Sequence, residues 1–172
     1  KKENIAIPNE TGVLQESGDQ RSRGVEAEVV VQASRDWQVF MNYAYNDAEL
    51  TSFREFVQTF TGPIIADRSG NTPAFAPKHL MNLWTNKEFD FGLGIGLGAR
   101  YISSQFIAED NAFAIDNVLT LDALLYYDFG PCRVNVNFKN LTDREYFTRG
   151  FGSTSVIPAN PFAVYGGIEL AL

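Results

Sequence analysis

The sequence has very few of the residues that form cross-links and metal sites. Its 172 residues include one cysteine, Cys132, and one histidine, His79. A single cysteine excludes an internal disulfide framework, and together with a single histidine it excludes the Cys/His zinc motifs. A Ser/His/Asp triad could form only around His79, whose sequence neighbours suggest none. We therefore expect no enzyme activity, no metal ion and no other cofactor.

Basic residues and long apolar runs are scarce as well. The 14 Lys and Arg residues are outnumbered by 21 Asp and Glu residues, which gives a formal net charge of -7. Because nucleic-acid binding rests on clustered cations, no nucleic-acid partner is expected. Hydrophobic residues make up 45% of the chain, yet no apolar run approaches the ~18 residues of a membrane-spanning helix. By composition alone the chain resembles an acidic soluble protein.

The organisation of the chain indicates one domain or a part of one. Residues 1–9 contain neither an initiator methionine nor the apolar core and cleavage site of a signal peptide. We therefore expect the sequence to begin within a longer chain or after processing. No internal repeat and no low-complexity linker divides it.

Apolar and polar residues alternate along most of the chain, a pattern that is typical of β-strands with one apolar face. The alternation predicts strands at about residues 25–34, 37–46, 78–87, 93–101, 119–127, 133–139 and 162–171. The phase of residues 78–87 is ambiguous. In the last four strands the charged residues fall on the face opposite the apolar one, and they are Arg100, Asp122, Arg133, Lys139 and Glu169.

Short and long connections alternate strictly between these strands. Short turns are expected near residues 34–36, 90–92 and 130–131, whereas residues 51–72, 108–117 and 141–160 form longer connections. This pattern indicates an up-and-down antiparallel sheet, as in outer-membrane barrels with short periplasmic turns and longer outer loops. A soluble β-sandwich would also exclude charge from one face, so it remains an alternative.

Aromatic residues at strand ends favour the membrane barrel. Trp37 begins a strand that ends in Tyr43 and Tyr45, and Phe89 and Phe91 flank a turn. From Trp37 to Tyr45 a strand tilted by ~40° rises roughly 20 Å, close to the ~25 Å apolar band between the aromatic girdles of such barrels.

Four segments carry a family resemblance. They are RSRGVEAE at residues 21–28, NYAYNDA at 42–48, NTPAFAPKHLMNLW at 71–84 and NFKNLTDREY at 137–146. Together, and in this order, they resemble the C-terminal strands of a TonB-dependent outer-membrane receptor of the siderophore-receptor type. The resemblance covers residues 19–172.

The resemblance implies an all-β, antiparallel up-and-down transmembrane β-barrel of about 22 strands, filled by an N-terminal plug. Such receptors lie in the outer membrane of Gram-negative bacteria and import a ferric siderophore or a similar scarce nutrient with energy from TonB. Residues 1–172 would then be a single partial domain of about seven C-terminal strands without the plug, because such a barrel needs on the order of 440 residues. The chain departs from the family at Leu172, since such barrels usually end on an aromatic residue.

The partners implied by the resemblance are outer-membrane lipid, the TonB complex through the missing plug, and a ferric siderophore or related small ligand. The length also fits a stand-alone barrel of about eight strands with a structural or adhesion role, in which residues 1–13 supply the eighth strand. A soluble β-sandwich that serves as a binding module is the remaining alternative.

If a ligand is bound, the long connections are expected to bind it, because loops on a rigid scaffold concentrate binding residues. Arg beside aromatic side chains suits an anionic aromatic ligand, and equally an ordinary loop on the outer leaflet. The candidates are Phe53, Arg54, Phe56, Phe60 and Arg68 in the first long loop and Arg144, Tyr146, Phe147, Arg149 and Phe151 in the last.

A second set of residues is expected to face the barrel lumen and, by the resemblance, the plug. It comprises Glu26, Glu28, Gly94, Gly96, Gly98, Arg100, Asp122, Arg133, Lys139 and Glu169. Because its charges have both signs, we expect them to pair across neighbouring strands rather than to line a substrate path. The glycines alternate within a strand, so they form no phosphate-binding loop, and we expect a strip open to the close approach of another backbone.

Three isolated residues have structural interpretations. Asn140 begins a glycosylation sequon, but it is expected to form the turn that ends a strand. Cys132 falls on the apolar parity and is expected to be a structural thiol. His79 lacks partner ligands and is expected to lie at the strand rim.

Overall fold

All regular structure in the described residues is β-strand. The computed structural model describes residues 2–8, 13–152 and 154–170. The strands are β1 (Lys2–Pro8), β2 (Leu14–Ser34), β3 (Trp37–Thr59), β4 (Gly62–Asp67), β5 (His79–Glu88), β6 (Leu93–Ile102), β7 (Gln105–Phe106), β8 (Ala114–Ile115), β9 (Val118–Phe129), β10 (Cys132–Lys139), β11 (Phe147–Phe151), β12 (Ser155–Pro158) and β13 (Ala163–Leu170). Within those ranges no helix is long and apolar enough to cross a membrane.

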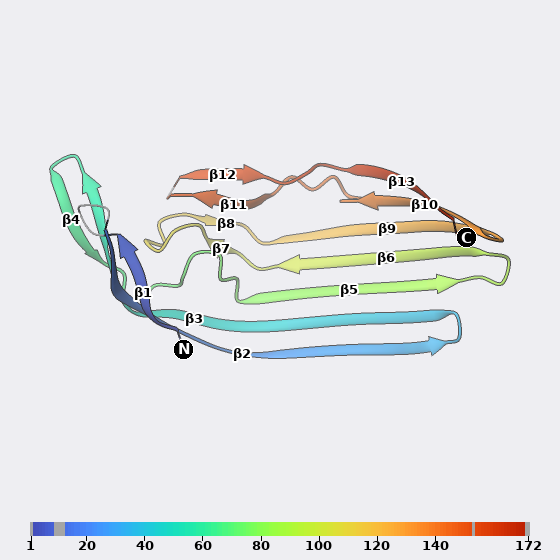
Figure 1. The fold of residues 1–172 in the computed structure, drawn as a ribbon, viewed down its shortest axis with the longest axis horizontal. Coiled ribbons are helices and arrows are strands. Elements are labelled where there is room, and N and C mark those ends of the chain that lie inside the picture. The colour runs from blue at the N-terminus through green and yellow to red at the C-terminus, as the bar shows by residue number, and fades with distance from the viewer. Residues whose placement is uncertain (1, 9–12, 153, 171–172) are drawn as a thin grey trace.

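Most of these strands form one antiparallel sheet of nine strands (Figure 1). Its order is β1-β2-β3-β5-β6-β9-β10-β13, with β4 paired to β3, so the long strands follow one another in space as they do along the chain. The predicted up-and-down antiparallel sheet is confirmed. The predicted strands correspond to β2, β3, β5, β6, β9, β10 and β13.

The sheet stands alone and is open at both edges. The other strands form only the small pairs β7–β8 and β11–β12, so the described part of the chain contains no second sheet to pack as a sandwich. The soluble β-sandwich is therefore wrong. Residues 2–8 do form a strand, as the eight-stranded alternative required, but β1 and β13 are edge strands that do not pair with each other in the described ranges. Closure of eight strands is wrong as well.

The register places apolar side chains on one side of the sheet, which we call the apolar face, and the other side is the polar face. One row across five strands of the apolar face consists of Val29, Met41, Leu83, Ala99 and Leu121. Aliphatic side chains of this face remain exposed, Leu97 by 52% and Ile168 by 71%. The face therefore offers an apolar surface with no protein layer over it.

Aromatic side chains lie at both ends of the apolar face. At the turn end, Trp37 begins β3, and the rings of Tyr127 and Phe129 lie 4.5 Å apart between centroids. At the loop end, Tyr43 and Tyr45 of β3 contact His79, and the Tyr43 hydroxyl lies 2.8 Å from Nδ1 of His79. His79 is thus a rim residue, as expected.

The position of Lys87 shows which residues of β5, the strand of ambiguous phase, belong to the apolar face. It lies opposite Trp37 and Ile95 in the ladder, so it belongs to the apolar face. It stands at the turn end, where its ammonium group pairs with the Asp36 carboxylate and lies 5.9 Å from the ring centroid of Phe89. A lysine at this level can extend its charge away from the apolar band.

The longer connection expected at residues 51–72 is present, but much of it is regular structure. β3 continues to Thr59, and β4 pairs back onto it from Asp67 opposite Arg54 to Gly62 opposite Thr59. The resulting hairpin projects beyond the sheet (Figure 1). Gly62 adopts φ 121° directly after the turn, a conformation that other residues rarely adopt.

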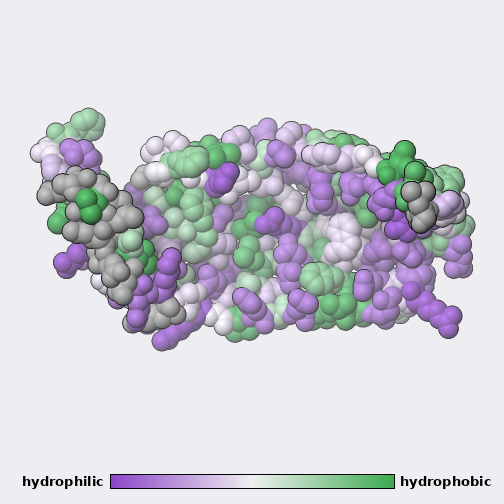
Figure 2. Space-filling model, in the orientation of Figure 1, coloured by the Kyte–Doolittle hydropathy of each residue, from purple (hydrophilic) through white to green (hydrophobic). Residues whose placement is uncertain are grey.

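Few large side chains are buried in the described residues. The buried apolar ones are Ala48, Leu50, Phe53, Ile107, Ile115, Val118 and Tyr126. All but Tyr126 lie at the loop end. Apolar side chains elsewhere reach the molecular surface along the sheet (Figure 2). The hydrophobic content is thus displayed on a face rather than enclosed in a core, as expected of strands that face lipid.

Candidate ligand-binding site

Charged side chains of the polar face pair across neighbouring strands. The Lys139 ammonium lies 2.9 Å from Oδ2 of Asp122, between β10 and β9. Nearer the turn end, the Arg133 guanidinium lies 2.6 Å from Oδ1 of Asp128 and 4.2 Å from the ring centroid of Tyr126. Lys139 and Arg133 therefore have acidic partners, as expected for lumen residues whose charges have both signs.

Arg100 differs from them. It lies on the polar face of β6, opposite Thr120 of β9, and it is exposed. No Asp or Glu of the described residues forms an ion pair with its guanidinium. Asp122, which comes next along the same face of β9, is already occupied, because it also accepts a hydrogen bond from the backbone N–H of Asn140 at 2.9 Å. Within the described part of the chain, the positive charge of Arg100 is thus not neutralised by a carboxylate.

Two adjoining hollows at the loop end share Arg100, Thr120, Tyr146 and Thr148, and we call them together the Arg100 pocket. The smaller hollow measures about 110 Å³ and extends to Gln105. The larger measures about 370 Å³ and extends towards the paired Lys139. Strands β6 and β9 form the floor of the pocket, and the segment that enters β11 lies over it.

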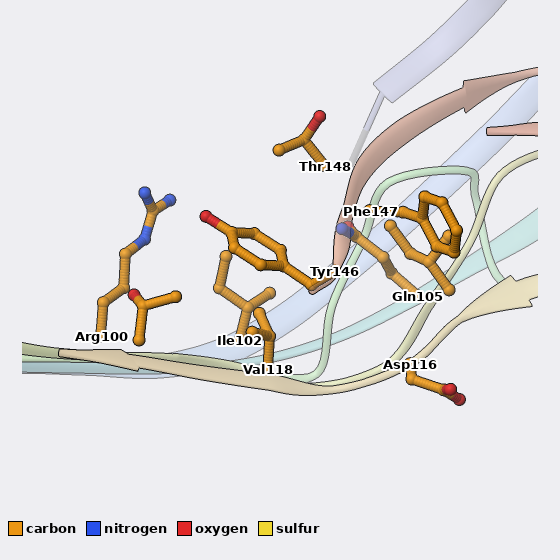
Figure 3. Close-up of a pocket in the computed structure, with 10 residues that line it drawn as sticks. Arg100, Ile102, Gln105, Asp116, Val118, Tyr146, Phe147 and Thr148 are labelled. Atoms are coloured by element: carbon orange, nitrogen blue, oxygen red, sulfur yellow. The ribbon is translucent and has the colours of Figure 1, made fainter. Parts of the chain in front are cut away.

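Figure 3 shows how the polar groups of the pocket are directed. The guanidinium of Arg100 and the ring of Tyr146 rise on the same side of the sheet, and the Tyr146 hydroxyl points towards the guanidinium side. The carboxylate of Asp116, the acidic residue of the smaller hollow, points away from both. The charge directed into this hollow is therefore positive.

Asn140 brings the last loop over the sheet. Its side chain is 5% exposed and its backbone adopts φ 52°, a left-handed conformation that Asn tolerates well. Oδ1 accepts a hydrogen bond from the backbone N–H of Arg144 at 2.9 Å, and Nδ2 donates to the carbonyls of Arg144 at 3.0 Å and Asn160 at 3.3 Å. One side chain thus joins both ends of the loop, and the turn predicted at residues 140–142 is present.

The predicted ligand residues of this last loop separate into two groups. Tyr146 and Phe147 line the Arg100 pocket. Arg144, Arg149 and Phe151 are exposed and do not line it.

The predicted ligand residues of the first long connection do not line this pocket. Phe53 is 8% exposed and packs against Leu50. Arg68 is engaged with Glu55 at 2.8 Å and Arg54 lies 3.8 Å from Asp67, so both arginines face acids of their own hairpin. Phe56 is half-buried, and Phe60 is fully exposed at the hairpin turn.

The glycines of β6 lie on the polar face, but the strip above them is not open. A Cβ atom on Gly98 would come within 2.5 Å of the Trp84 ring, and one on Gly96 within 2.6 Å of it. A Cβ atom on Gly94 would collide with the ring of Tyr126. Aromatic side chains of the neighbouring strands, rather than another backbone, fill this space.

Trp84 is the residue that sequence reasoning missed here. It lies opposite Gly98 in the ladder, on the polar face of the strand whose phase was ambiguous. The sequence contained a signal for this packing, because the glycines of β6 recur at every second position and the preceding strand contains a tryptophan. The signal could be used only once the register had shown that Trp84 lies opposite Gly98.

The remaining predicted lumen residues lie on the polar face outside the pocket. Glu26 and Glu28 of β2 face Ala44 and Asn42 and are exposed. Glu169 lies opposite Arg133 on β13. Across the described ranges, no group of three or more His, Cys, Asp or Glu side chains is placed to hold a metal ion.

A comparison with protein-family models tests the family resemblance that the sequence motifs suggested. The family described as TonB dependent receptor-like, beta-barrel, matches residues 2–141. The chain belongs to the TonB-dependent receptor β-barrel family. The expected outer-membrane location and antiparallel barrel architecture are thereby confirmed.

Two curated relatives of the chain are a ferrichrome transporter and a ferrioxamine receptor. It is 33% identical over 158 residues to the ferrichrome outer membrane transporter/phage receptor of Escherichia coli (strain K12), covering 87% of this chain and 20% of the relative. It is 28% identical over 137 residues to the ferrioxamine receptor of Yersinia enterocolitica, covering 76% of this chain and 18% of that protein. The chain therefore spans about a fifth of the length of these relatives.

A solved structure has the same fold. The crystal structure of the siderophore receptor PiuA from Acinetobacter baumannii superimposes with a TM-score of 0.84 at 22% identity, covering 97% of this chain and 24% of PiuA. The open sheet of this chain therefore has the fold of about a quarter of that receptor.

Proposed function

We propose that this chain forms part of the wall and the ligand-binding mouth of a receptor that imports a ferric siderophore with energy from TonB. The observation that carries the proposal is the Arg100 pocket, a hollow on the polar face at the loop end that contains an unneutralised cation. The relatives named above, which are receptors for ferrichrome and ferrioxamine, support the choice of a siderophore. The proposed activity is transport, without a catalytic step.

The two faces of the sheet have separate roles in this proposal. The apolar face contacts outer-membrane lipid, because its aliphatic band between two aromatic rows suits a hydrocarbon layer. The polar face lines the lumen, where its charged residues and the aromatic rings that cover the glycines of β6 would face the plug. The loop end then lies on the outer side of the membrane, where the Arg100 pocket meets ligand arriving from outside.

The chain is proposed to be the C-terminal part of the barrel and a single partial domain. Its share of about a fifth of the relatives' length and the two open sheet edges support a partial domain, and the order of the four motifs supports the C-terminal part. The contact with TonB would then be made through a plug that other parts of the receptor supply.

Transport can be tested in a Gram-negative host stripped of its own ferric-siderophore receptors. The complete receptor that contains this chain is expressed in that host, and uptake of iron-55 from a panel of ferric chelates is measured. We expect uptake of at least one ferric siderophore, which disappears when TonB is deleted. Correct insertion of the receptor with no uptake of any ferric siderophore in the panel would contradict the proposal.

A further inference from the structure

We infer that the Arg100 pocket selects negatively charged ferric chelates with aromatic oxygen ligands, such as catecholates, over uncharged chelates. The inference rests on the proposed function and names the ligand class of the same site. Its starting observation is the contrast between Arg100 and the other cations of the polar face, because Lys139 and Arg133 have carboxylate partners and Arg100 has none among the described residues.

The charges around the pocket do not cancel that of Arg100. The Asp122 carboxylate accepts hydrogen bonds from the Lys139 ammonium and from the backbone N–H of Asn140. The charges of Asp122 and Lys139 therefore neutralise each other. Asp116 points away from Arg100 and Tyr146 (Figure 3). An anion that enters the pocket therefore meets one guanidinium whose attraction is not offset by a neighbouring carboxylate.

The uncharged groups of the pocket suit an oxygen-rich aromatic ligand. Thr120, Thr148 and Tyr146 bring hydroxyl groups, and Gln105 brings an amide. The ring of Tyr146 and the guanidinium of Arg100 line the same pocket on the same side of the sheet (Figure 3), so an aromatic ligand held between them would have a ring and a cation to contact. The larger hollow, about 370 Å³, falls within the ~300–1,000 Å³ of small-molecule sites.

Charge is what separates the two common chelate classes at such a site. Catecholate groups leave ferric iron with a net negative charge, whereas three hydroxamate groups neutralise it. A hydrogen bond from a guanidinium to an anionic oxygen is about twice as strong as one between neutral groups. Arg100 should thus favour the catecholate complex, while the hydroxyl groups serve both classes alike.

The test uses the complete receptor and two synthetic probes with the same backbone, a ferric tris-catecholate and a ferric tris-hydroxamate. Binding of each is measured by quenching of protein fluorescence at low and high salt. We expect Arg100→Gln to weaken catecholate binding about tenfold or more and hydroxamate binding less than about threefold. Arg100→Lys should recover part of the loss, and the salt dependence of catecholate binding should fall in Arg100→Gln.

A matched control removes an arginine far from the pocket. Arg35 lies in the β2–β3 turn at the other end of the sheet, and Arg35→Gln should leave both affinities unchanged. Equal losses for both probes in Arg100→Gln, or no loss for either, would overturn the inference while leaving the proposed function intact. Failure of the unmodified receptor to bind either probe would overturn the inference directly, and the uptake experiment above would then decide the proposed function separately.

Discussion

The ring of Tyr126 lies directly over Gly94 on the polar face of the sheet. The ring is fixed at its hydroxyl, which donates to Oε1 of Glu88 at 2.5 Å and accepts from Nδ2 of Asn86 at 3.1 Å. Glu88 is itself opposite Gly94 in the ladder. The glycine and the tyrosine therefore form one packed unit across three strands, β5, β6 and β9.

Gly94→Ala should destabilise the receptor. The new methyl group would collide with the Tyr126 ring, and overpacking of this kind costs ~1–3 kcal/mol. We expect a lower temperature for the heat-induced mobility shift of the folded barrel on SDS gels. The matched control is Gly166→Ala, because a Cβ atom there would meet only the Asn135 carbonyl at 4.0 Å. Equal shifts in both variants would contradict the packing role of Gly94.

Asn140→Ala should release the last loop while the sheet remains folded. It removes three hydrogen bonds to loop backbone and puts a less suitable residue at φ 52°. Leaving such buried groups unpaired costs ~1–3 kcal/mol. We expect faster tryptic cleavage after Arg144 and Arg149, measured by mass spectrometry of the intact receptor. Asn117→Ala is the control, since Asn117 makes one long bond of 3.5 Å to Tyr101, and equal cleavage in both variants would refute the anchoring role.

Spin labels can distinguish the two faces. With Cys132 replaced by Ser, a label at Leu121 on the apolar face should relax faster with oxygen, which concentrates in hydrocarbon. A label at Asn137 on the polar face should respond more to a water-soluble nickel complex. Both positions follow from the register, and the measurement is power saturation in lipid vesicles. The same preference at both sites would show that the assignment of faces is wrong.

Stability in acid should depend on Asp36 in the β2–β3 turn. Hydrogen bonds from Lys87 and then Ser34 hold the pKa of this carboxyl group below its usual range. A lowered folded-state pKa stabilises above the unfolded pKa of about 3.9, and this contribution is lost as the pH falls through the folded value. The difference in unfolding temperature between the unmodified protein and Asp36→Asn should therefore be positive at neutral pH and shrink towards zero in acid. A difference that stays constant with pH would rule out this linkage.

The strands were predictable because each alternates with period two, and the apolar parity from Leu93 to Tyr101 or from Val134 to Phe138 agrees with the register found. The extent of β3 was not predictable from the same signal. Beyond Tyr45 the pattern is irregular, and the strand persists because β2 pairs with it as far as Phe53 and β4 from Arg54 to Thr59. The length of a strand that is stabilised by pairing with another strand cannot be predicted from its own sequence pattern alone.

The candidate site was predicted in pieces and not as a unit. Tyr146 was assigned to a ligand loop and Arg100 to a structural charge network, and only the fold brings them into one pocket. The difference between Arg100 and Lys139 lies in which carboxylate is within reach, and that depends on cross-strand register. The turn at Asn140, by contrast, was predictable, because it follows from local chemistry of the Asn side chain.

The two open edges of the sheet determine how this segment acquires its stability. In hydrocarbon each backbone group without a hydrogen-bond partner costs several kcal/mol. The edge at β13, and the edge of β2 beyond Gln20, where β1 no longer pairs with it, are therefore tolerable only when other strands pair with them. With few buried side chains among the described residues to compensate, we expect that the segment does not fold as an independent cooperative unit. In the proposed barrel, its folding should therefore be coupled to that of the strands that pair with these edges. A mutation that disturbs either pairing should then lower the yield of the whole receptor rather than loosen one part of it.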